Sequence, residues 1–459
     1  MKNPFSSGAP YYKRMLQIAI PTMIQNGVTN FVNMLDNVMV GQVGTLQMTG
    51  VSIVNQLLFV FNLCIFGAMS GAGIFTAQFY GKKDNDGVKN TVQFKIVTAV
   101  LFTVLGIGVF LLLGDTLIAA YIQEGSDPAD AALVAEYSRK YLNIMLFNTL
   151  PFAIGQAYAS SLRETKDRVI PMISTVSAVL INLVLNYILI FGHFGAPEMG
   201  IEGAAVATVI ARFAECAILV IWSHTHKKKY PFIARLFTHT TITLQQIKKI
   251  SVITVPLILN EALWATGMAF LNQCYSVRGL SVVAAINIVS TLSNVFNVSF
   301  LSFGSSIGII LSQMLGAGEK EEAKKASTKM IGFAVFTVFG IAALMCCFSG
   351  VFPDIYNTEE SVKKLATTLI LIMAAYMPIQ CFLNSCYFSL RSGGKTVITF
   401  IFDSGFVWAV VIPLAFYISR FTELPIIPFY IIIQAVDIIK CIIGYVFLKK
   451  GVWLNTVVD

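Results

Sequence analysis

Two carboxyl groups inside long apolar stretches are the residues of this sequence best suited to chemistry. Asp36 lies in the stretch 15–40 and Glu261 in the stretch 250–276. A charged side chain inside a bilayer is costly unless it faces a partner or a water-filled cavity, so each acid is a candidate functional site. The alternatives are that Asp36 lies near a helix end with loop water close by, and that Glu261 is a structural carboxyl satisfied by neighbouring helices.

Neutral polar residues accompany the first acid at helical spacing. Asn33 precedes Asp36 by three residues, so both lie on one polar face of a helix. Asn182 and Asn186 are one turn apart in a later stretch, and Thr208 in the next stretch can join them. Because hard cations take oxygen ligands, two amides, a hydroxyl and a carboxylate predict a small-cation or proton site. Hydrogen bonding between helices is the alternative.

The second acid has a polar and aromatic face of its own. Glu261 is followed on its helical face by four residues that suit a substrate cavity: Trp264, Met268, Asn272 and Tyr275. Another stretch, 366–390, carries a similar face formed by Tyr376, Gln380, Asn384 and Tyr387. We expect this second face to line the cavity beside Glu261. A satisfied helix–helix contact is the alternative.

Other charged residues within apolar stretches are spaced for local ion pairs. Arg212 and Glu215 are three residues apart, and so are Asp437 and Lys440. Side chains three apart on a helix are neighbours, so we expect a structural ion pair in both cases. Asp403 either faces a cavity or lies near the membrane interface, and the sequence leaves this open.

The composition requires lipid as the solvent for most of the chain. Of the 459 residues, 56% are hydrophobic and only 12% are charged, with a mean hydropathy of +0.74. A helix needs about 20 mainly apolar residues to cross a bilayer. Such stretches recur at 15–40, 50–78, 92–113, 137–159, 170–192, 202–222, 250–276, 281–312, 329–350, 366–390, 396–418 and 425–448. Continuous runs of this length predict an all-α membrane protein with twelve transmembrane helices, not a β-barrel.

Basic residues predict the orientation in the membrane. Most of the 32 Lys and Arg residues fall on the inner side if the N-terminus is cytoplasmic. We therefore expect a multi-pass protein of the cell inner membrane with both termini in the cytoplasm. The net charge of +8 then reflects topology, and no nucleic-acid partner is expected. All eight cysteines lie in apolar stretches, which indicates buried thiols and no disulfide framework.

An internal repeat divides the chain. A shift of 235 positions brings Gln78 onto Gln313 and Gly81 onto Gly316. Six helices per copy is an even number, so the copies share one topology and can be related by an axis along the membrane normal. The prediction is two pseudo-symmetric lobes around a central cavity, formed by residues 1–222 and 250–459, with 223–249 as a cytoplasmic linker loop.

Patterns that suggest an enzyme lie in the wrong context. Residues 304–308 (GSSIG) match a nucleophile elbow, but they lie in an apolar helix and the stretches contain no His to complete a triad. His224 and His226 have metal-like spacing without an obvious third ligand. We expect no enzymatic activity, no cofactor and no metal centre, apart from a coupling Na⁺ at Asp36 or Glu261. Gradients of ions or of the substrate are then the energy source.

Three segments carry a resemblance to a known family. Residues 34–44 (MLDNVMVGQVG), 200–208 (GIEGAAVAT) and 389–391 (SLR) resemble segments of the multidrug and toxic compound extrusion (MATE) family, in its NorM-like bacterial branch. Length, twelve stretches, duplication and the long central loop agree with it. The resemblance implies a V-shaped, two-lobed antiporter that exports cationic, amphipathic organic compounds in exchange for Na⁺ or H⁺. Its partners would be small organic cations or drugs and the bilayer, and the protein would be monomeric.

The resemblance also implies roles for the acids. Asp36 matches the N-lobe acid of the family, with Asn182 and Thr208 as helpers, while Asn186 falls where some members carry Asp.

In the other half, Glu261 matches the C-lobe acid and Tyr376 a tyrosine near the cation site, whereas Gln380 replaces an acidic residue. A lipid-linked saccharide flippase of the same superfamily is the alternative function. It would need a strongly cationic cavity, and Arg212, the one basic residue that is assigned to neither side of the membrane, argues against it.

Overall fold

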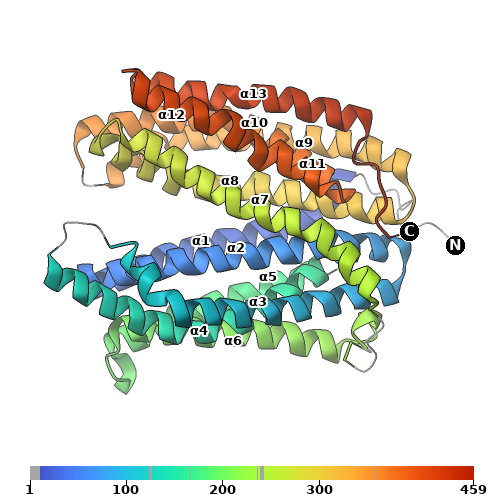
Figure 1. Cartoon of the computed structure of the whole chain (residues 1–459), viewed down its shortest axis with the longest axis horizontal. Coiled ribbons are helices and arrows are strands. Elements are labelled where there is room, and N and C mark those ends of the chain that lie inside the picture. Colours follow the sequence, from blue (N-terminus) through green and yellow to red (C-terminus); the bar gives the residue numbers. More distant parts are fainter. Residues whose placement is uncertain are drawn as a thin grey trace. The chain divides into compact units, whose positions relative to one another are not determined.

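Long helices account for most of the chain (Figure 1). The structure is a computed structural model, and it describes residues 11–122, 127–165, 167–234, 236–237, 242–356 and 358–458. Within these ranges there is no strand. An apolar chain in lipid must satisfy its backbone N–H and C=O groups within each segment, which a helix does. The predicted all-α fold is confirmed.

The helices follow one another with short connections. They are α1 (Tyr11–Val43), α2 (Thr45–Lys82), α3 (Asn85–Ala119), α4 (Pro128–Thr165), α5 (Val169–Phe191), α6 (Gly200–Thr225), α7 (Leu244–Ser276), α8 (Leu280–Gly316), α9 (Lys320–Phe348), α10 (Glu360–Ser392) and α13 (Ile426–Lys450). Between the last two, α11 (Thr396–Phe400) continues through the π-helical stretches η4 (Ile401–Gly405) and η5 (Val407–Val411) into α12 (Ile412–Phe421). Single 3₁₀ turns occur at η1 (His193–Gly195), η2 (Pro231–Ile233) and η3 (Pro353–Ile355).

Ten helices of the described chain are long and apolar enough to cross a membrane. The helices α1 and α4 are not among them, although they have 33 and 38 residues, because polar side chains lower their hydropathy. With these two included, each of the twelve predicted stretches coincides with one long helical segment. That α1 and α4 also cross the membrane stays a prediction.

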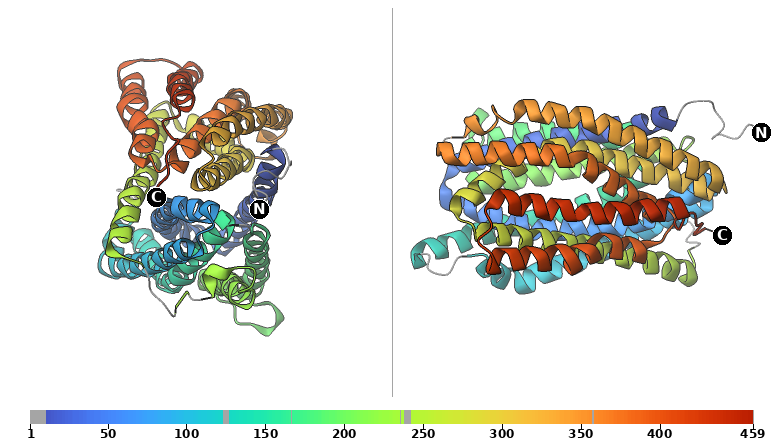
Figure 2. Two further views of the ribbon diagram at one scale, coloured as in Figure 1. Left: turned by 90° about the vertical axis from the view of Figure 1, so that its right-hand side faces the viewer. Right: turned by 90° about the horizontal axis from the view of Figure 1, so that it is seen from above.

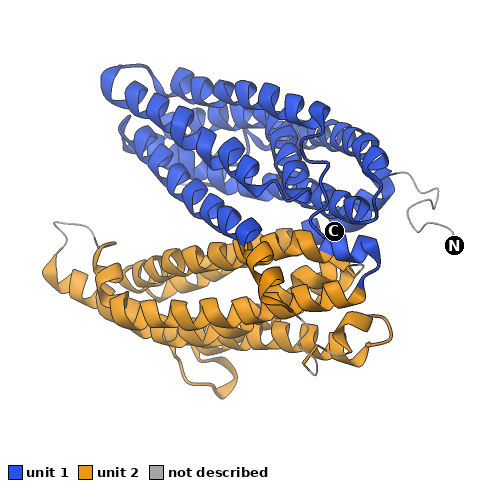
Figure 3. Ribbon diagram, turned by 45° about the vertical axis from the view of Figure 1, so that its right-hand side comes forward, with its two compact units in different colours: residues 1–23, 77–84, 252–459 blue, residues 24–76, 85–251 orange. Residues whose placement is uncertain are grey.

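Backbone contacts divide the chain into two compact units (Figure 3). Unit 1 comprises residues 1–23, 77–84 and 252–459, and unit 2 comprises residues 24–76 and 85–251. These packing boundaries differ from the predicted lobes 1–222 and 250–459, because the start of α1 and the last turns of α2 pack in unit 1. The lobes follow the sequence repeat, and the division at the central loop stays a prediction.

Within unit 2, the main packing pairs are α5 with α6, α4 with α6 and α3 with α4. In Figure 2 the long helices of unit 2 run lengthwise beside one another. A Cβ atom at Gly203 of α6 would lie 2.6 Å from the Leu189 carbonyl oxygen of α5. Only glycine permits so close a helix crossing, and this crossing brings the polar faces of α5 and α6 together.

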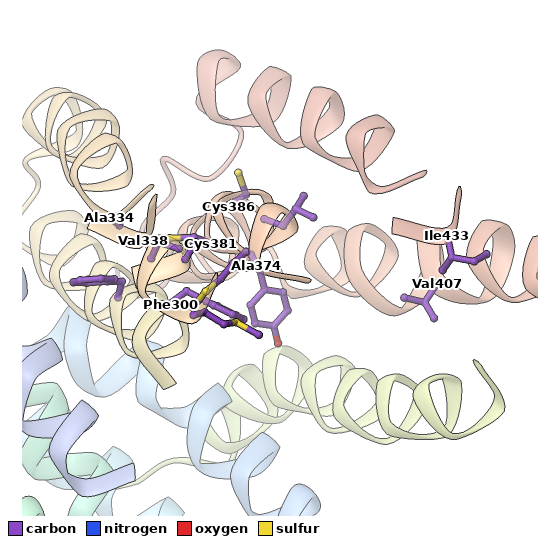
Figure 4. Packing of buried hydrophobic residues seen from close by; sticks show 14 of the residues in the cluster. Phe300, Ala334, Val338, Ala374, Cys381, Cys386, Val407 and Ile433 are labelled. Atoms are coloured by element: carbon purple, nitrogen blue, oxygen red, sulfur yellow. The ribbon is translucent and has the colours of Figure 1, made fainter. Parts of the chain in front are cut away.

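The apolar core of unit 1 is built mainly by α8, α9, α10 and α13. Figure 4 shows part of it, including Phe300, Val338 and Cys381. Three cysteines are buried as predicted, namely Cys274, Cys381 and Cys386. The prediction is wrong for Cys346 and Cys347, which are exposed on α9 because an apolar helix in lipid also carries apolar residues on its outer face.

A buried ion pair lies inside unit 2. The Lys95 side chain of α3 is 0% exposed, and its Nζ lies 2.5 Å from Glu164 Oε2 of α4. The same Nζ donates to the hydroxyls of Ser160 and Ser161 at 3.1 and 3.3 Å. Gly73 leaves room for the carboxylate, because a Cβ atom there would lie 2.1 Å from Glu164 Oε1.

Helical residues and side-chain contacts occur within the predicted linker 223–249. Helix α6 continues to Thr225 and α7 begins at Leu244, so the predicted linker 223–249 includes helical residues at both ends. Lys229 and the buried Tyr230 both donate to the Asp167 carboxylate in the α4–α5 connection. Burial alone would raise the pKa of Asp167, but these hydrogen bonds outweigh it and hold the pKa below its usual value. The loop is thereby anchored on unit 2.

We predict that Lys95→Met destabilises the protein by about 3–5 kcal/mol, because it leaves the Glu164 carboxylate buried and unpaired. Thermal unfolding in detergent measures this as a lower midpoint. The double variant Lys95→Met/Glu164→Gln should recover most of the loss. A matched control is Lys140→Ala, which breaks an exposed pair with Glu136 and should change little. An unchanged midpoint for Lys95→Met would contradict the assignment.

Candidate ion and substrate sites

The predicted N-terminal cluster assembles within unit 2. Asp36 comes from α1, Asn182 and Asn186 from α5, and Thr208 from α6. Asn186 Nδ2 donates to Asp36 Oδ1 at 2.6 Å. The two asparagines are four residues apart on α5, which puts both on the face toward Asp36. The structure therefore brings together all four residues that the sequence pointed to.

The orientation of the Asn182 amide completes the contact. Its nitrogen, when turned toward Asp36, lies 2.9 Å from Oδ2, and its oxygen then accepts from the Thr208 hydroxyl at 3.2 Å. The reverse orientation would point the amide oxygen at the carboxylate, where both atoms are acceptors. With the nitrogen toward Asp36, both carboxylate oxygens accept hydrogen bonds from neutral amides.

The cluster has a negative charge without a paired positive charge. Among the described residues no basic side chain forms an ion pair with Asp36. Arg212 acts on Asp36 through its charge, but it pairs with Glu215 at 2.7 Å, as predicted. Asn186 is 1% exposed, and within the described chain its Oδ1 has no hydrogen-bond partner. A carboxylate beside an unsatisfied amide oxygen is the donor set that a small cation or a hydronium ion would complete.

The second acid lies in a different setting, in unit 1. Glu261 Oε1 accepts from the Tyr387 hydroxyl at 3.2 Å. Asn260 Nδ2 lies 3.3 Å from the same hydroxyl and donates to Asp403 Oδ2 at 3.1 Å. Arg391 Nη1 is 3.5 Å from the Tyr387 hydroxyl, so a fixed positive charge acts on Glu261. Glu261 is thus one end of a polar network that links α7, α10 and η4.

The ion pair at the other end of this network corrects a prediction. Lys440 Nζ lies 2.7 Å from Asp403 Oδ1, so Lys440 does not pair with Asp437 on its own helix. The prediction was wrong because spacing along one helix says nothing about a carboxylate on a facing helix. Asp403 lies in the π-helical stretch, whose wider turn changes the direction of side chains. Asp403 is therefore an ion-paired residue.

Two residues predicted for a C-terminal ion site lie apart from Glu261. The Tyr376 hydroxyl donates to Asp437 on α13. Gln380 interacts with the same hydroxyl. In the part of the chain that the structure describes, no hydrogen bond joins Tyr376 or Gln380 to Glu261. The polar face of α10 is thus divided between two contacts. Tyr387 contacts Glu261 of α7, whereas Tyr376 contacts Asp437 of α13.

The predicted cavity residues are dispersed. Exposed side chains are Asn33, Trp264 and Asn272, while Met268 is half-buried against the core of unit 1. Tyr275 is 3% exposed, and its ring packs 5.0 Å from that of Phe429 in this core. Asn384 is half-buried and its Oδ1 lies against Gly304, where a Cβ atom would approach to 2.0 Å. Tyr275 is therefore a packing residue, and whether the others line a cavity stays a prediction.

Sequence reasoning missed Asn260, which directly precedes Glu261. Its amide bridges Tyr387 and Asp403, and its Oδ1 also accepts from the Ser404 hydroxyl at 2.8 Å. A buried polar residue beside an intramembrane acid is a usable signal, because such residues need partners. The identity of those partners depends on which helices pack together, and spacing in a single sequence does not give this.

The chain matches a known protein family over most of its length. The model of the MatE family matches residues 21–188 and 256–418, which together make up most of the chain. The probable multidrug resistance protein NorM of Thermotoga maritima is 26% identical over 455 residues, covering 96% of this chain and 93% of the relative. The probable multidrug resistance protein YoeA of Bacillus subtilis is 24% identical over 424 residues, covering 91% and 89%.

Solved structures share the fold. A crystal structure of MATE in complex with MaL6 has a TM-score of 0.86 at 18% identity, and the match covers 99% of both chains. A MOP superfamily transporter from Pyrococcus furiosus, described by a reverse polarity of its binding pocket that suggests a different function, has a TM-score of 0.84 at 18% identity and equal coverage. At this identity the likeness concerns the fold alone. The family model, in contrast, spans both halves of the sequence, and this chain belongs to the MATE (MatE) family of membrane transporters.

Proposed function

We propose that this protein is a secondary active multidrug efflux antiporter. It exports cationic, amphipathic organic compounds in exchange for Na⁺ or H⁺, and Asp36 is the coupling carboxylate. One observation carries the proposal: Asp36 has neutral hydrogen-bond partners, and a buried amide oxygen beside it lacks a donor among the described residues. The multidrug resistance names of the NorM and YoeA relatives support the substrate class.

Charge balance favours Asp36 over Glu261 as the site of coupling. A half-buried carboxylate at membrane depth that has no ion-pair partner is stabilised by a mobile cation or by a proton. The charge of Arg212 that acts on Asp36 is compensated by Glu215. The charge of Arg391 that acts on Glu261 has no acid partner among the ion pairs of the described residues, and the Asp403 of its network is paired with Lys440. We propose that Glu261 and Tyr387 organise unit 1 and contribute to substrate binding.

Exchange follows from competition at one carboxylate. When a coupling cation or proton occupies Asp36, an organic cation loses its electrostatic partner there, and the reverse also holds. Thermodynamic linkage makes this mutual weakening equal in both directions. If the site opens alternately to the two sides of the membrane, release of one cation permits binding of the other. No cofactor is needed for this cycle.

A flippase for lipid-linked saccharides is the second candidate. Its pyrophosphate group would need free basic side chains in the cavity. Of the basic residues that the structure describes at the two polar sites, Arg212 and Lys440 are paired with acids, which leaves the charge of Arg391 beside Tyr387. One such charge is not the strongly cationic cavity that a pyrophosphate needs. The fold alone does not choose, since a similarly folded transporter is described with a pocket of reverse polarity. The charge pairing makes the cation exporter the better candidate.

The proposed setting is the inner membrane of the cell, with the protein as a monomer. Lys and Arg predominate in the connections on the side that would carry both termini. This distribution supports a cytoplasmic location for both ends. The side that contains the α2–α3 and α6–α7 connections is accordingly proposed as the cytoplasmic side.

We predict that Asp36→Asn abolishes gradient-driven export. The amide retains the shape of the side chain but removes the charge, so efflux of a cationic dye should fall at least about tenfold, the scale of a coupling energy. The measurement is dye transport in vesicles with Na⁺ and pH gradients imposed separately. The control is Asp115→Asn, at an exposed carboxylate. Wild-type efflux in a well-expressed Asp36→Asn variant would refute the coupling role.

We predict that Glu261→Gln retains most of the gradient-driven efflux in the same assay. Gln keeps an oxygen that accepts from the Tyr387 hydroxyl, and the coupling charge at Asp36 is unchanged. The apparent dye affinity is expected to change, whereas the dependence on the ion gradient remains. Loss of gradient dependence in Glu261→Gln, with Asp36→Asn active, would move the coupling site to unit 1.

A further inference from the structure

The connection between α6 and α7 has a strongly positive charge. Between Glu215 and Glu261 the sequence has no acidic residue but six basic ones, namely Lys227, Lys228, Lys229, Arg235, Lys248 and Lys249. Lys229 pairs with Asp167, and Arg235 lies outside the described residues. The other four, here called the loop lysines, are exposed and form no ion pair with a described residue: Lys227, Lys228, Lys248 and Lys249.

Two acids at the same end of unit 2 already have partners. Asp167, in the α4–α5 connection, accepts from Lys229 and from Tyr230. Asp86, in the first turn of α3, pairs with Lys89 at 3.2 Å. The charges of the loop lysines are therefore available to an anion from outside the chain.

Hydrogen bonds hold the α6–α7 connection on the first turns of α3. Gln93 Nε2 donates to the Leu236 carbonyl at 2.6 Å, and Asn90 Nδ2 donates to Gln246 Oε1 at 3.4 Å. Thr243 and Gln246 cap the start of α7 reciprocally, each backbone N–H donating to the side-chain oxygen of the other at 3.1 and 3.2 Å. The loop lysines thus stand at the two ends of a connection that is fixed on unit 2.

These lysines lie where lipid headgroups would surround the helices. Lys227 follows the apolar stretch 202–222 by five residues, and Lys249 directly precedes the stretch 250–276. Five residues at the helical rise of 1.5 Å cover about 7.5 Å. The headgroup layer on each side of a bilayer is about 5–7 Å deep, so the lysine side chains can reach headgroup phosphates.

Apolar side chains in the same connection are also exposed. Phe237 is 70% exposed, and Leu244 in the first turn of α7 is 82% exposed. Ile247, three residues after Leu244 and on the same face of the helix, is 36% exposed and directly precedes Lys248. A soluble anion would leave these side chains in water, whereas a bilayer surface offers negative headgroups beside hydrocarbon. Charge and apolarity together favour a membrane surface over a nucleic acid or an acidic protein.

We propose that the loop lysines, together with Phe237 and Leu244, form a binding surface for anionic lipids. The lysine ammonium groups bind headgroup phosphates, and the two apolar side chains enter the boundary between headgroups and acyl chains. A phosphatidylglycerol headgroup has a net negative charge, whereas the choline of phosphatidylcholine balances its own phosphate. The surface therefore selects the anionic lipid. It rests on the proposed topology only for its leaflet, the cytoplasmic one.

Lipid binding to the purified full-length protein in detergent tests this surface. The probes are phosphatidylglycerol and phosphatidylcholine with the same fluorescent label on one acyl chain. Dissociation constants are measured for both probes at low and at high salt. The double variants are Lys227→Gln/Lys228→Gln and Lys248→Gln/Lys249→Gln. The matched control is Lys320→Gln/Lys325→Gln, which removes as much charge from exposed lysines of α9, next to Glu321 and Glu322.

We expect the wild type to bind phosphatidylglycerol at least about tenfold more tightly than phosphatidylcholine, because each lysine near anionic headgroups adds about fivefold. This preference should fall at least about fivefold in each double variant, and it should also fall at high salt. The α9 control should keep it. Phe237→Ser should weaken the binding of both probes in equal proportion. Thermal unfolding midpoints check that the variants are folded, and the two double variants decide independently.

Equal affinity of the wild type for the two probes, or an equal loss of preference in the α9 control, would overturn the proposal. Displacement of the lipid by inorganic phosphate or by an RNA homopolymer at the same phosphate concentration would also overturn it, because the surface would then bind soluble anions. Binding is read without a gradient or a dye. If Asp36→Asn transports normally while the lysine variants lose the preference, the coupling assignment fails and the lipid surface stands.

Discussion

The half-buried carboxylate of Asp36 is the interaction on which the account of this transporter depends. Two asparagine amides of α5 hold it, and Thr208 orients one of them. Neutral amides fix the position of the carboxylate but do not cancel its charge. In a low-dielectric setting the remaining charge is costly, so binding of a cation or a proton is favoured. Binding and release there can be coupled to transport.

Other charged groups inside the described helices are neutralised by ion pairs. Lys95 pairs with Glu164 and is further bonded to two serines. Lys440 pairs with Asp403, in contact with the network of Glu261. Such pairs add order to a helix bundle but have no capacity for a mobile ion. Two acids that look alike in the sequence thus differ in their electrostatic surroundings.

Much of the fold was predictable from sequence. In lipid the backbone N–H and C=O groups of a long apolar segment must bond to one another, and a helix achieves this. Family membership confirms the expectation of a transporter and not an enzyme. The members of the Asp36 cluster were predictable because polar residues are rare in these apolar stretches, and Asn182 and Asn186 lie one turn apart on one helix. The partner of Lys440 was predicted wrongly, and Tyr275 lies in the core, because both depend on which helices pack together. The attachment of α2 to unit 1 had no signal beyond the repeat.

Equilibrium binding of a cationic dye to the purified protein tests the central claim most directly. The dye affinity is measured at increasing Na⁺ concentration at fixed pH, and at decreasing pH without Na⁺. The account predicts that the affinity falls in at least one of the two series, because dye and coupling ion compete for the Asp36 carboxylate. A dye affinity that is independent of both Na⁺ and pH would contradict it.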